Sequence, residues 1–423
     1  MYEGGLAGVR FLQTAFLLGF VLLFMWLVMS APIGVRTITR TIRINGSLDK
    51  IKSALHPFGE NFTWNQAVSA VEKIDAGSGT MVTTHADRSG GFIERDFSIA
   101  DDGHSWRTWF TSDTSLAQDF WKHHEMGTTL SSVEEGVTDV TISETDSYRG
   151  IAFMVFRFFS LRRQALKLKI WTEQGTFQRG GLFEKPSTQF GMAILSALLL
   201  WPVFGLHFDG LILSIMLTAV VGLHELGHII AFRMMGHKGA RMVFIPILGG
   251  IAMGGRPYDR HFEIGFSALM GAGFSAFLMA FPMLFAAVAR WQVDPTIVQG
   301  IIVFVLMGSL FNLGNLIPVW KFDGGQVLRQ VFRSRIGLSI GSFVLLSWFF
   351  VVGFALGLPS KMLLVAGTIF ALLSVMTSRG GIKPKKPLTP MTSSERFAIL
   401  AAFAAVFSIH ASVLLWSAES LLS

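Results

Sequence analysis

Long apolar runs and one long polar stretch divide this chain of 423 residues. The first apolar run covers about Phe11–Ala31. It exceeds the apolar core of roughly 7–15 residues in a cleaved signal peptide, so it predicts a retained transmembrane anchor. From Lys185 onward the chain is almost wholly apolar. Further spans are expected there at about Phe190–Leu206, Leu211–Met235, Ile264–Ala289, Ile297–Val319, Gly337–Leu356, Met362–Thr377 and Phe397–Leu415. Together these runs predict a polytopic α-helical membrane protein of about eight transmembrane helices.

The polar stretch contains no run long enough to cross a bilayer. Thr37–Ile44 alternates between polar and apolar residues like a half-buried strand, and Ser47–Leu55 is typical of a short helix. Strands are expected at Thr80–Thr84, Gly91–Ile99, His104–Phe110 and Gly136–Ser143, before one long helix over Ser147–Glu173. This order resembles the α+β helix-grip fold of the START-like and polyketide-cyclase-like superfamily. The resemblance implies a gap between sheet and helix that holds an apolar ligand; a packed domain without a ligand is the alternative.

Basic residues follow three of the expected spans and set the orientation of the chain. They are Arg233, Lys238 and Arg241, then Lys321, Arg329, Arg333 and Arg335, then Arg379, Lys383, Lys385 and Lys386. Because Lys and Arg accumulate in cytoplasmic loops, we expect the polar stretch in the cytoplasm and both termini outside. The net charge of +7 then reflects loop charge, and no nucleic-acid partner is expected. The lack of organelle-targeting features favours a bacterial inner membrane.

One apolar span carries the sequence His224-Glu225-Leu226-Gly227-His228. Residues four apart share one face of a helix, so both imidazoles can bind one metal ion while Glu225 takes a proton from a bound water. Ionisable groups at the bilayer centre cost roughly 2.5–3.5 kcal/mol each and therefore indicate function. The chain has no cysteine, which restricts metal ligands to His, Asp and Glu. Asp209 is expected to cap this helix.

A catalytic zinc ion usually has three protein ligands and a water, so a third ligand must come from another span. Asp323 is the best candidate, because Pro318 would end or kink the preceding helix and Gly324-Gly325 permits a close backbone approach. Met242–Gly255 is apolar but too rich in Gly and Pro for a spanning helix. Irregular backbone at membrane depth needs protein or water beside it, so a re-entrant, strand-like loop is expected. Such a loop can pair with an extended substrate.

The two motifs, His-Glu-x-Gly-His and Asn-x-x-Pro-x-x-x-x-Asp-Gly two spans later, resemble the double signature of the site-2 protease family of intramembrane zinc metalloproteases. The resemblance covers about residues 187–378. It implies one zinc ion per chain, held by His224, His228 and Asp323, with Glu225 as general base. The chain departs from one branch of the family, because it leaves no room for a PDZ domain between the third and fourth core spans.

Six further residues are expected to bind substrate or support the site: Asn315, Pro318, Gly271, Ser275, Gly249 and Gly250. Asn315 can bind the substrate backbone, hold Asp323 in place or cap the kink. Gly271 and Ser275 resemble the Gly-x-x-x-Asn/Ser/Gly motif of the family, and small residues at this spacing are also typical of helix packing in membranes. The two other glycines end a stretch that resembles the strand-forming loop of the family.

The sequence therefore predicts four regions: an anchor (1–34), a cytoplasmic helix-grip-like domain (35–186), a zinc protease core (187–378), and a basic loop with an extra span (379–423). The expected function is cleavage of membrane proteins within or near a span. The alternative is a lipid-responsive sensor, in which residues 35–186 bind an apolar ligand or a protein partner and proteolysis is secondary or lost. An ion transporter is disfavoured because no series of polar residues continues through the spans.

Overall fold

The computed structural model describes residues 31–65, 67–86, 91–175, 186–237, 239–245, 249–289, 292–318, 322–332, 334–355 and 385–422, with a few isolated positions. The expected span Met362–Thr377 and almost all of the expected anchor Phe11–Ala31 lie outside these residues. Contacts divide the chain into two compact units, Met1–Gly181 with Gly381–Pro387, and Leu182–Gly380 with Leu388–Ser423.

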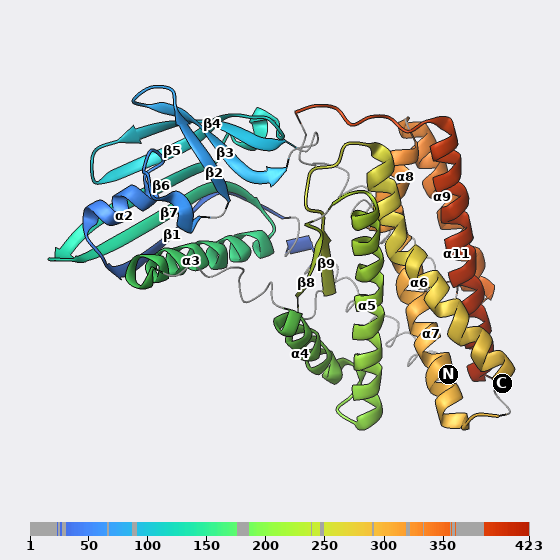
Figure 1. Cartoon of the computed structure of the whole chain (residues 1–423). Coiled ribbons are helices and arrows are strands. Elements are labelled where there is room, and N and C mark those ends of the chain that lie inside the picture. Colours follow the sequence, from blue (N-terminus) through green and yellow to red (C-terminus); the bar gives the residue numbers. More distant parts are fainter. Residues whose placement is uncertain are drawn as a thin grey trace, which may run out of the picture. The chain divides into compact units, whose positions relative to one another are not determined.

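The first unit is an antiparallel sheet with one long helix (Figure 1). Its seven strands follow the spatial order β1-β7-β6-β5-β4-β3-β2. Its elements are β1 (Pro32–Asn45), α2 (Leu48–Leu55), η1 (Phe62–Trp64), β2 (Val68–Lys73), β3 (Ser78–Ala86), β4 (Phe92–Asp101), β5 (Ser105–Asp113), η2 (Gln118–Phe120), β6 (Glu125–Glu134), β7 (Val137–Arg149) and α3 (Ile151–Gln174).

The core of this unit lies where the C-terminal half of α3 packs on the sheet. Leu161, Ala165 and Leu168 of the helix are buried and belong to one apolar cluster with Ile44 of β1 and Val140 of β7. Three or four residues separate these helix positions, so they form one stripe facing the strands. The alternating strand positions supply the other half of the core.

The expected element order agrees with the structure, but two details of the prediction were wrong. The long helix begins at Ile151 rather than Ser147, because Ser147 still pairs with Val35 in the sheet and Gly150, at φ +78°, separates strand from helix. Strands β2 and β6 were not predicted. Most of β6 is polar or exposed, so it lacks the alternation that marks a half-buried strand.

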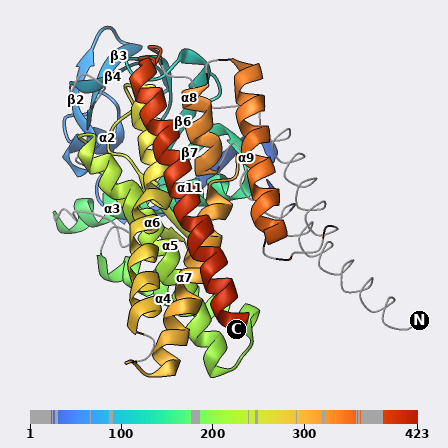
Figure 2. The same cartoon turned by 90° about the vertical axis from the view of Figure 1, so that its right-hand side faces the viewer.

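The second unit is a helical bundle with a short hairpin (Figures 1 and 2). Its elements are α4 (Pro186–Phe204), α5 (Phe208–Met234), β8 (Arg241–Ile245), β9 (Gly249–Met253), α6 (His261–Ala289), α7 (Pro295–Asn315), α8 (Asp323–Val331), α9 (Arg335–Ala355) and α11 (Ser393–Leu422). Among the described residues, six of these helices are long and apolar enough to cross a membrane, α8 being too short. Strands β8 and β9 pair antiparallel, with Phe244 opposite Gly250.

Two helix boundaries differ from the sequence prediction. Helix α7 ends at Asn315 rather than Val319, three residues before Pro318, and its last carbonyls are capped by the Leu316 N–H. The cap of α5 is His207 instead of Asp209: His207 Nδ1 accepts a hydrogen bond from the Gly210 N–H at 3.1 Å. Asp209 lies in the first turn, where its charge favours the positive end of the helix dipole.

Candidate metal centre

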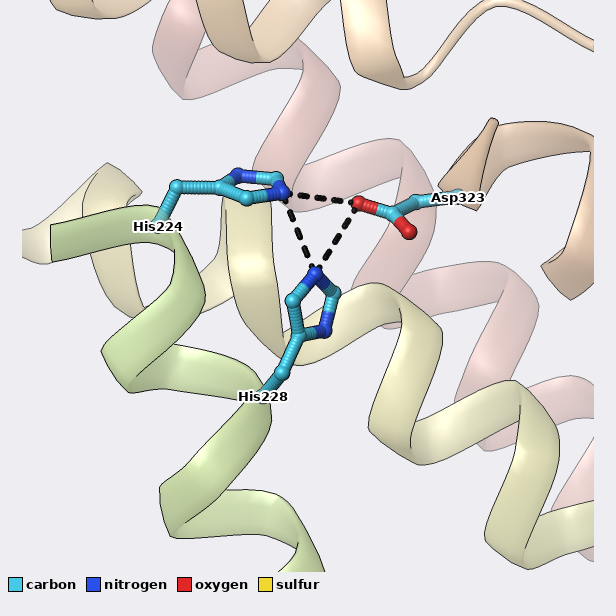
Figure 3. Close-up of side chains that lie close together, drawn as sticks. All are labelled: His224, His228 and Asp323. Carbon is cyan, nitrogen blue, oxygen red and sulfur yellow. Dashed lines mark hydrogen bonds and ion pairs between the residues drawn. The ribbon is translucent and has the colours of Figure 1, made fainter. Parts of the chain in front are cut away.

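Three side chains from two distant parts of the chain converge in the second unit (Figure 3). His224 and His228 project from one face of α5, and Asp323 is the first residue of α8. Asp323 Oδ2 lies 3.0 Å from His224 Nε2 and 3.4 Å from His228 Nε2, and the two nitrogens are 3.1 Å apart. All three residues are largely buried.

The outer nitrogen of each imidazole is held by an oxygen. His228 Nδ1 lies 2.7 Å from the Ser267 carbonyl, which can only accept, so this nitrogen carries the proton. His224 Nδ1 lies 2.8 Å from Asn312 Oδ1. The Asn312 amide nitrogen donates to the Gly308 carbonyl at 2.7 Å, which directs its oxygen toward the imidazole. In the neutral rings, both Nε2 atoms therefore present lone pairs to the centre.

This donor set fits a bound cation. Two imidazole lone pairs and one carboxylate oxygen face a common point, and they repel each other unless positive charge lies between them. Apart from these nitrogens, no donor in the described parts of the chain reaches the buried Asp323 Oδ2. Metal-ligating histidines ordinarily donate their outer N–H to an oxygen, as His228 does here. Three protein ligands leave a position open for water or substrate.

Glycine lets the neighbouring helix α6 reach these imidazoles. A Cβ atom on Gly271 would lie 2.5 Å from His228 Nε2 and 2.7 Å from His224 Cε1. On the α5 side, a Cβ on Gly227 would lie 2.2 Å from the Met270 carbonyl oxygen. Side chains cannot occupy either space, so both glycines are needed for the observed approach of α5 and α6.

Asp323 is brought to the site by the end of one helix and the start of another. Helix α7 ends at Asn315, and Pro318 follows in a buried position without continuing the helix. A Cβ on Gly324 would lie 1.9 Å from the Leu316 carbonyl oxygen, so only glycine permits α8 to begin this close to the end of α7. The sequence predicted a close backbone approach at Gly324-Gly325, and the structure shows it at Gly324.

Glu225 lies beside the three-residue cluster in a pocket of about 270 Å³. Gly250 of β9 covers it, since a Cβ there would lie 2.3 Å from Glu225 Cγ. Tyr258, in the segment between β9 and α6, also lines the pocket, and burial raises its pKa to about 12. Its phenol group can donate a hydrogen bond in the pocket, and the sequence did not single out this residue.

The other expected site residues have different positions. Asn315 lines the pocket, and its amide donates to the Phe311 carbonyl at 3.2 Å within its own helix. Ser275 is buried and donates to the Gly271 carbonyl at 3.0 Å, which is a packing role inside α6. Gly249 begins β9 next to Gly250.

Sequence reasoning missed two polar residues that support the site. Asn312 is fully buried and holds His224. His410 of α11 is also fully buried: its Nε2 donates to the Ala272 carbonyl at 3.0 Å, and its Nδ1 faces Ser309 Oγ at 3.5 Å. A polar side chain inside an apolar span was the signal for both, because such groups are costly in a membrane without a partner.

Comparison with known proteins gives one relative with a described activity. A segment of 152 residues, 35% of this chain, is 28% identical to a zinc metalloprotease of Methanocaldococcus jannaschii and covers 39% of that protein. The chain thus matches well under half the length of this relative. No family model matches the chain.

Two solved structures resemble a third of the chain. They are Aha1 from Colwellia psychrerythraea (19% identity, 33% of this chain and 98% of that chain, TM-score 0.27) and a START superfamily protein from Mycobacterium smegmatis (12% identity, 33% and 99%, TM-score 0.26). The fold of the first unit is defined by its own strand order and its long helix.

Proposed function

We propose that this chain is an intramembrane zinc endopeptidase of the site-2 protease type, which cleaves membrane proteins within or beside a transmembrane segment. The observation that carries the proposal is the convergence of His224, His228 and Asp323 next to Glu225, in a pocket built by apolar helices long enough to cross a membrane. The similarity of one segment to a zinc metalloprotease supports the same chemistry.

Different residues of the chain would have different roles in peptide hydrolysis. His224, His228 and Asp323 would hold one zinc ion, and a bound zinc ion lowers the pKa of a coordinated water toward about 7 and polarises a carbonyl group. Glu225 is the group placed to accept the proton of the attacking water and to return it to the leaving amine. Asn312 and Ser267 keep both imidazoles in the orientation that binding requires.

Strand β9 is suited to present the substrate. A helical substrate hides its peptide bonds in hydrogen bonds, so it must unwind before attack. Gly250, Ile251 and Ala252 of β9 line the pocket, and an unwound segment can add to the hairpin as an extra strand. We propose that the hairpin is re-entrant and that substrates carry helix-breaking residues near the cut.

The test compares membrane proteins in cells that make the natural chain, Glu225→Gln, or the control Glu134→Gln at an exposed position of β6. Glu225→Gln keeps the shape of the side chain but removes the base. We expect at least one membrane protein to accumulate uncut with Glu225→Gln alone, with natural fragments that end within or beside a span. Mass spectrometry of intact proteins and fragments is the readout.

Metal analysis of the purified chain separates two causes of failure. About one zinc ion per chain is expected in the natural protein and in Glu225→Gln, and much less in a His228→Phe variant. Bound zinc without any change in the membrane proteins, under several stresses, would contradict proteolysis and favour a sensor. Equal zinc in all three proteins would contradict the metal centre itself.

A further inference from the structure

The N-terminal half of α3, residues 151–160, is apolar and yet uncovered. None of its residues is buried, whereas Leu161, Ala165 and Leu168 in the other half pack on the sheet. A contiguous exposed patch of this kind marks an interaction surface. Its large side chains are 41–68% exposed: Ile151, Phe153, Val155, Phe156, Phe158 and Phe159.

This half of the helix begins beside the residue where the first apolar run of the sequence ends. The Gly150 N–H donates to the Ala31 carbonyl at 2.8 Å, and Pro32 pairs with Arg149 across β1 and β7. The sequence before Ala31 is the apolar run that predicts a membrane anchor. If the sequence prediction of an anchor ending at Ala31 holds, the first turn of α3 starts where the chain leaves the bilayer.

The other end of α3 lies far from that level. Glu173 accepts a hydrogen bond from the Asn45 N–H at 2.8 Å, and the Thr172 carbonyl accepts one from Lys50 at 2.7 Å. These contacts are at the far end of β1, which at about 3.3 Å per residue is roughly 43 Å from Pro32. The C-terminal end of α3 is therefore distant from Ala31, and the apolar half is the part of the helix close to it.

Charges on the helix agree with this placement. Arg157 is turned toward the sheet, where its Nη1 lies 2.8 Å from Glu144 Oε1, so it does not interrupt the outer apolar surface. Arg162 lies two residues after the apolar half and is exposed. An apolar helical surface bordered by basic residues is typical of a segment at the headgroup boundary.

We propose that residues 151–160 of α3 insert into the lipid surface beside the first apolar run, with the exposed Arg162 among the headgroups. The partner is the bilayer itself, and its anionic lipids match the guanidinium group of Arg162. This contact fixes the soluble unit against the membrane independently of the proteolytic chemistry.

The chain has no cysteine, so an introduced cysteine can carry a single nitroxide label. The full chain is placed in vesicles of phosphatidylcholine and phosphatidylglycerol, with labels in Phe156→Cys or Phe159→Cys. Controls are Gln174→Cys at the far end of α3 and Ser132→Cys on β6, both exposed positions. Paramagnetic resonance then compares relaxation by oxygen, which concentrates in lipid, with relaxation by a water-soluble nickel chelate.

We expect relaxation by oxygen to exceed relaxation by the nickel chelate for labels at residues 156 and 159. For labels at residues 132 and 174 we expect the reverse. Relaxation by the nickel chelate at 156 and 159 equal to that at 132 would place the patch in water and overturn the proposal. Shielding from both reagents at 156 and 159 would show a covering of protein, which also overturns it. Gel filtration checks that each labelled variant is folded. If one of the two variants at 156 and 159 misfolds, the other still gives the result.

Discussion

At the scale of single residues, Gly271 determines how closely α6 approaches the two imidazoles. Because Gly271 has only a hydrogen atom as its side chain, it leaves room for both rings. The nearby Gly273 has no such role, since a Cβ atom there would lie 3.7 Å from its nearest neighbour. The pair offers a matched comparison within one turn of one helix.

Gly271→Ala is expected to lower zinc affinity by at least about tenfold, whereas Gly273→Ala leaves it unchanged. Overpacking costs typically 1–3 kcal/mol, and about 1.4 kcal/mol corresponds to a factor of ten. Competition with a chelator, followed by metal analysis, measures the affinity. Equal affinities for both variants would show that the imidazoles adjust freely to the added methyl group.

Substitution of Asn312 tests how strongly the hydrogen-bond partner of His224 affects zinc affinity. Asn312→Ala removes the acceptor from His224 Nδ1, and we expect zinc affinity to fall by roughly 10–100-fold. Asn312→Asp keeps an oxygen at that position and is expected to lose less. If alanine and aspartate cause the same loss, measured by the same competition, the role of Asn312 is packing rather than orientation of the ring.

At the scale of elements, α11 is part of the structure that holds the site, although it carries none of its ligands. It packs against α6 and α7, and the views in Figures 1 and 2 both show it alongside them. Through His410 it contacts Ala272, next to Gly271, and Ser309, three residues before Asn312. The last span therefore connects the two helices whose residues contact the imidazoles.

His410→Leu is expected to lower zinc affinity several-fold, because it frees the Ala272 carbonyl and the α6 segment that carries Gly271. His410→Gln retains a donor and is expected to recover part of the affinity, which a purely steric role would not produce. Ser408→Leu, at an exposed position of α11, is the control. Full retention of zinc by His410→Leu would limit α11 to general packing.

At the scale of the whole molecule, the first unit has its own core and is expected to unfold separately from the helical bundle. His56 directly follows α2 in this unit, and its Nδ1 accepts a hydrogen bond from the Phe58 N–H at 3.2 Å. Burial lowers the pKa of His56, and the opposing attraction of Asp101 does not cancel this effect. The folded unit therefore favours the neutral ring.

The unfolding temperature of the first unit is expected to fall by a few degrees as the pH drops below about 6.5, the ordinary pKa of histidine. In that range the unfolded chain binds the extra proton and the folded unit does not, so stability decreases with falling pH until the lowered pKa is reached. His56→Asn keeps an acceptor for the Phe58 N–H and cannot titrate. The unfolding temperature of this variant is therefore expected to fall less over the same pH range. Calorimetry of the full chain measures the unfolding temperature of the natural protein and of the variant. Identical pH profiles for the two proteins would contradict a role for His56 in the pH dependence.

The sequence by itself determined the features that depend on local pattern. Apolar length marked the described spans, and a spacing of four on a helix placed His224 and His228 on one face. Asp323 was identified because a charged residue is costly near a membrane span and because Pro318 ends the helix before it. The structure places Asp323 beside both imidazoles. These inferences need only a few neighbouring residues, so a single sequence contains them.

Only the tertiary structure decided which distant residues approach one another. It separated Gly271, which faces the imidazoles, from Ser275, which packs within α6, and it brought Asn312 and His410 to the site from other helices. It also showed that one half of α3 is buried and the other exposed, although both halves contain apolar residues. Contacts of this kind depend on packing between elements far apart in the chain, and no local pattern records them.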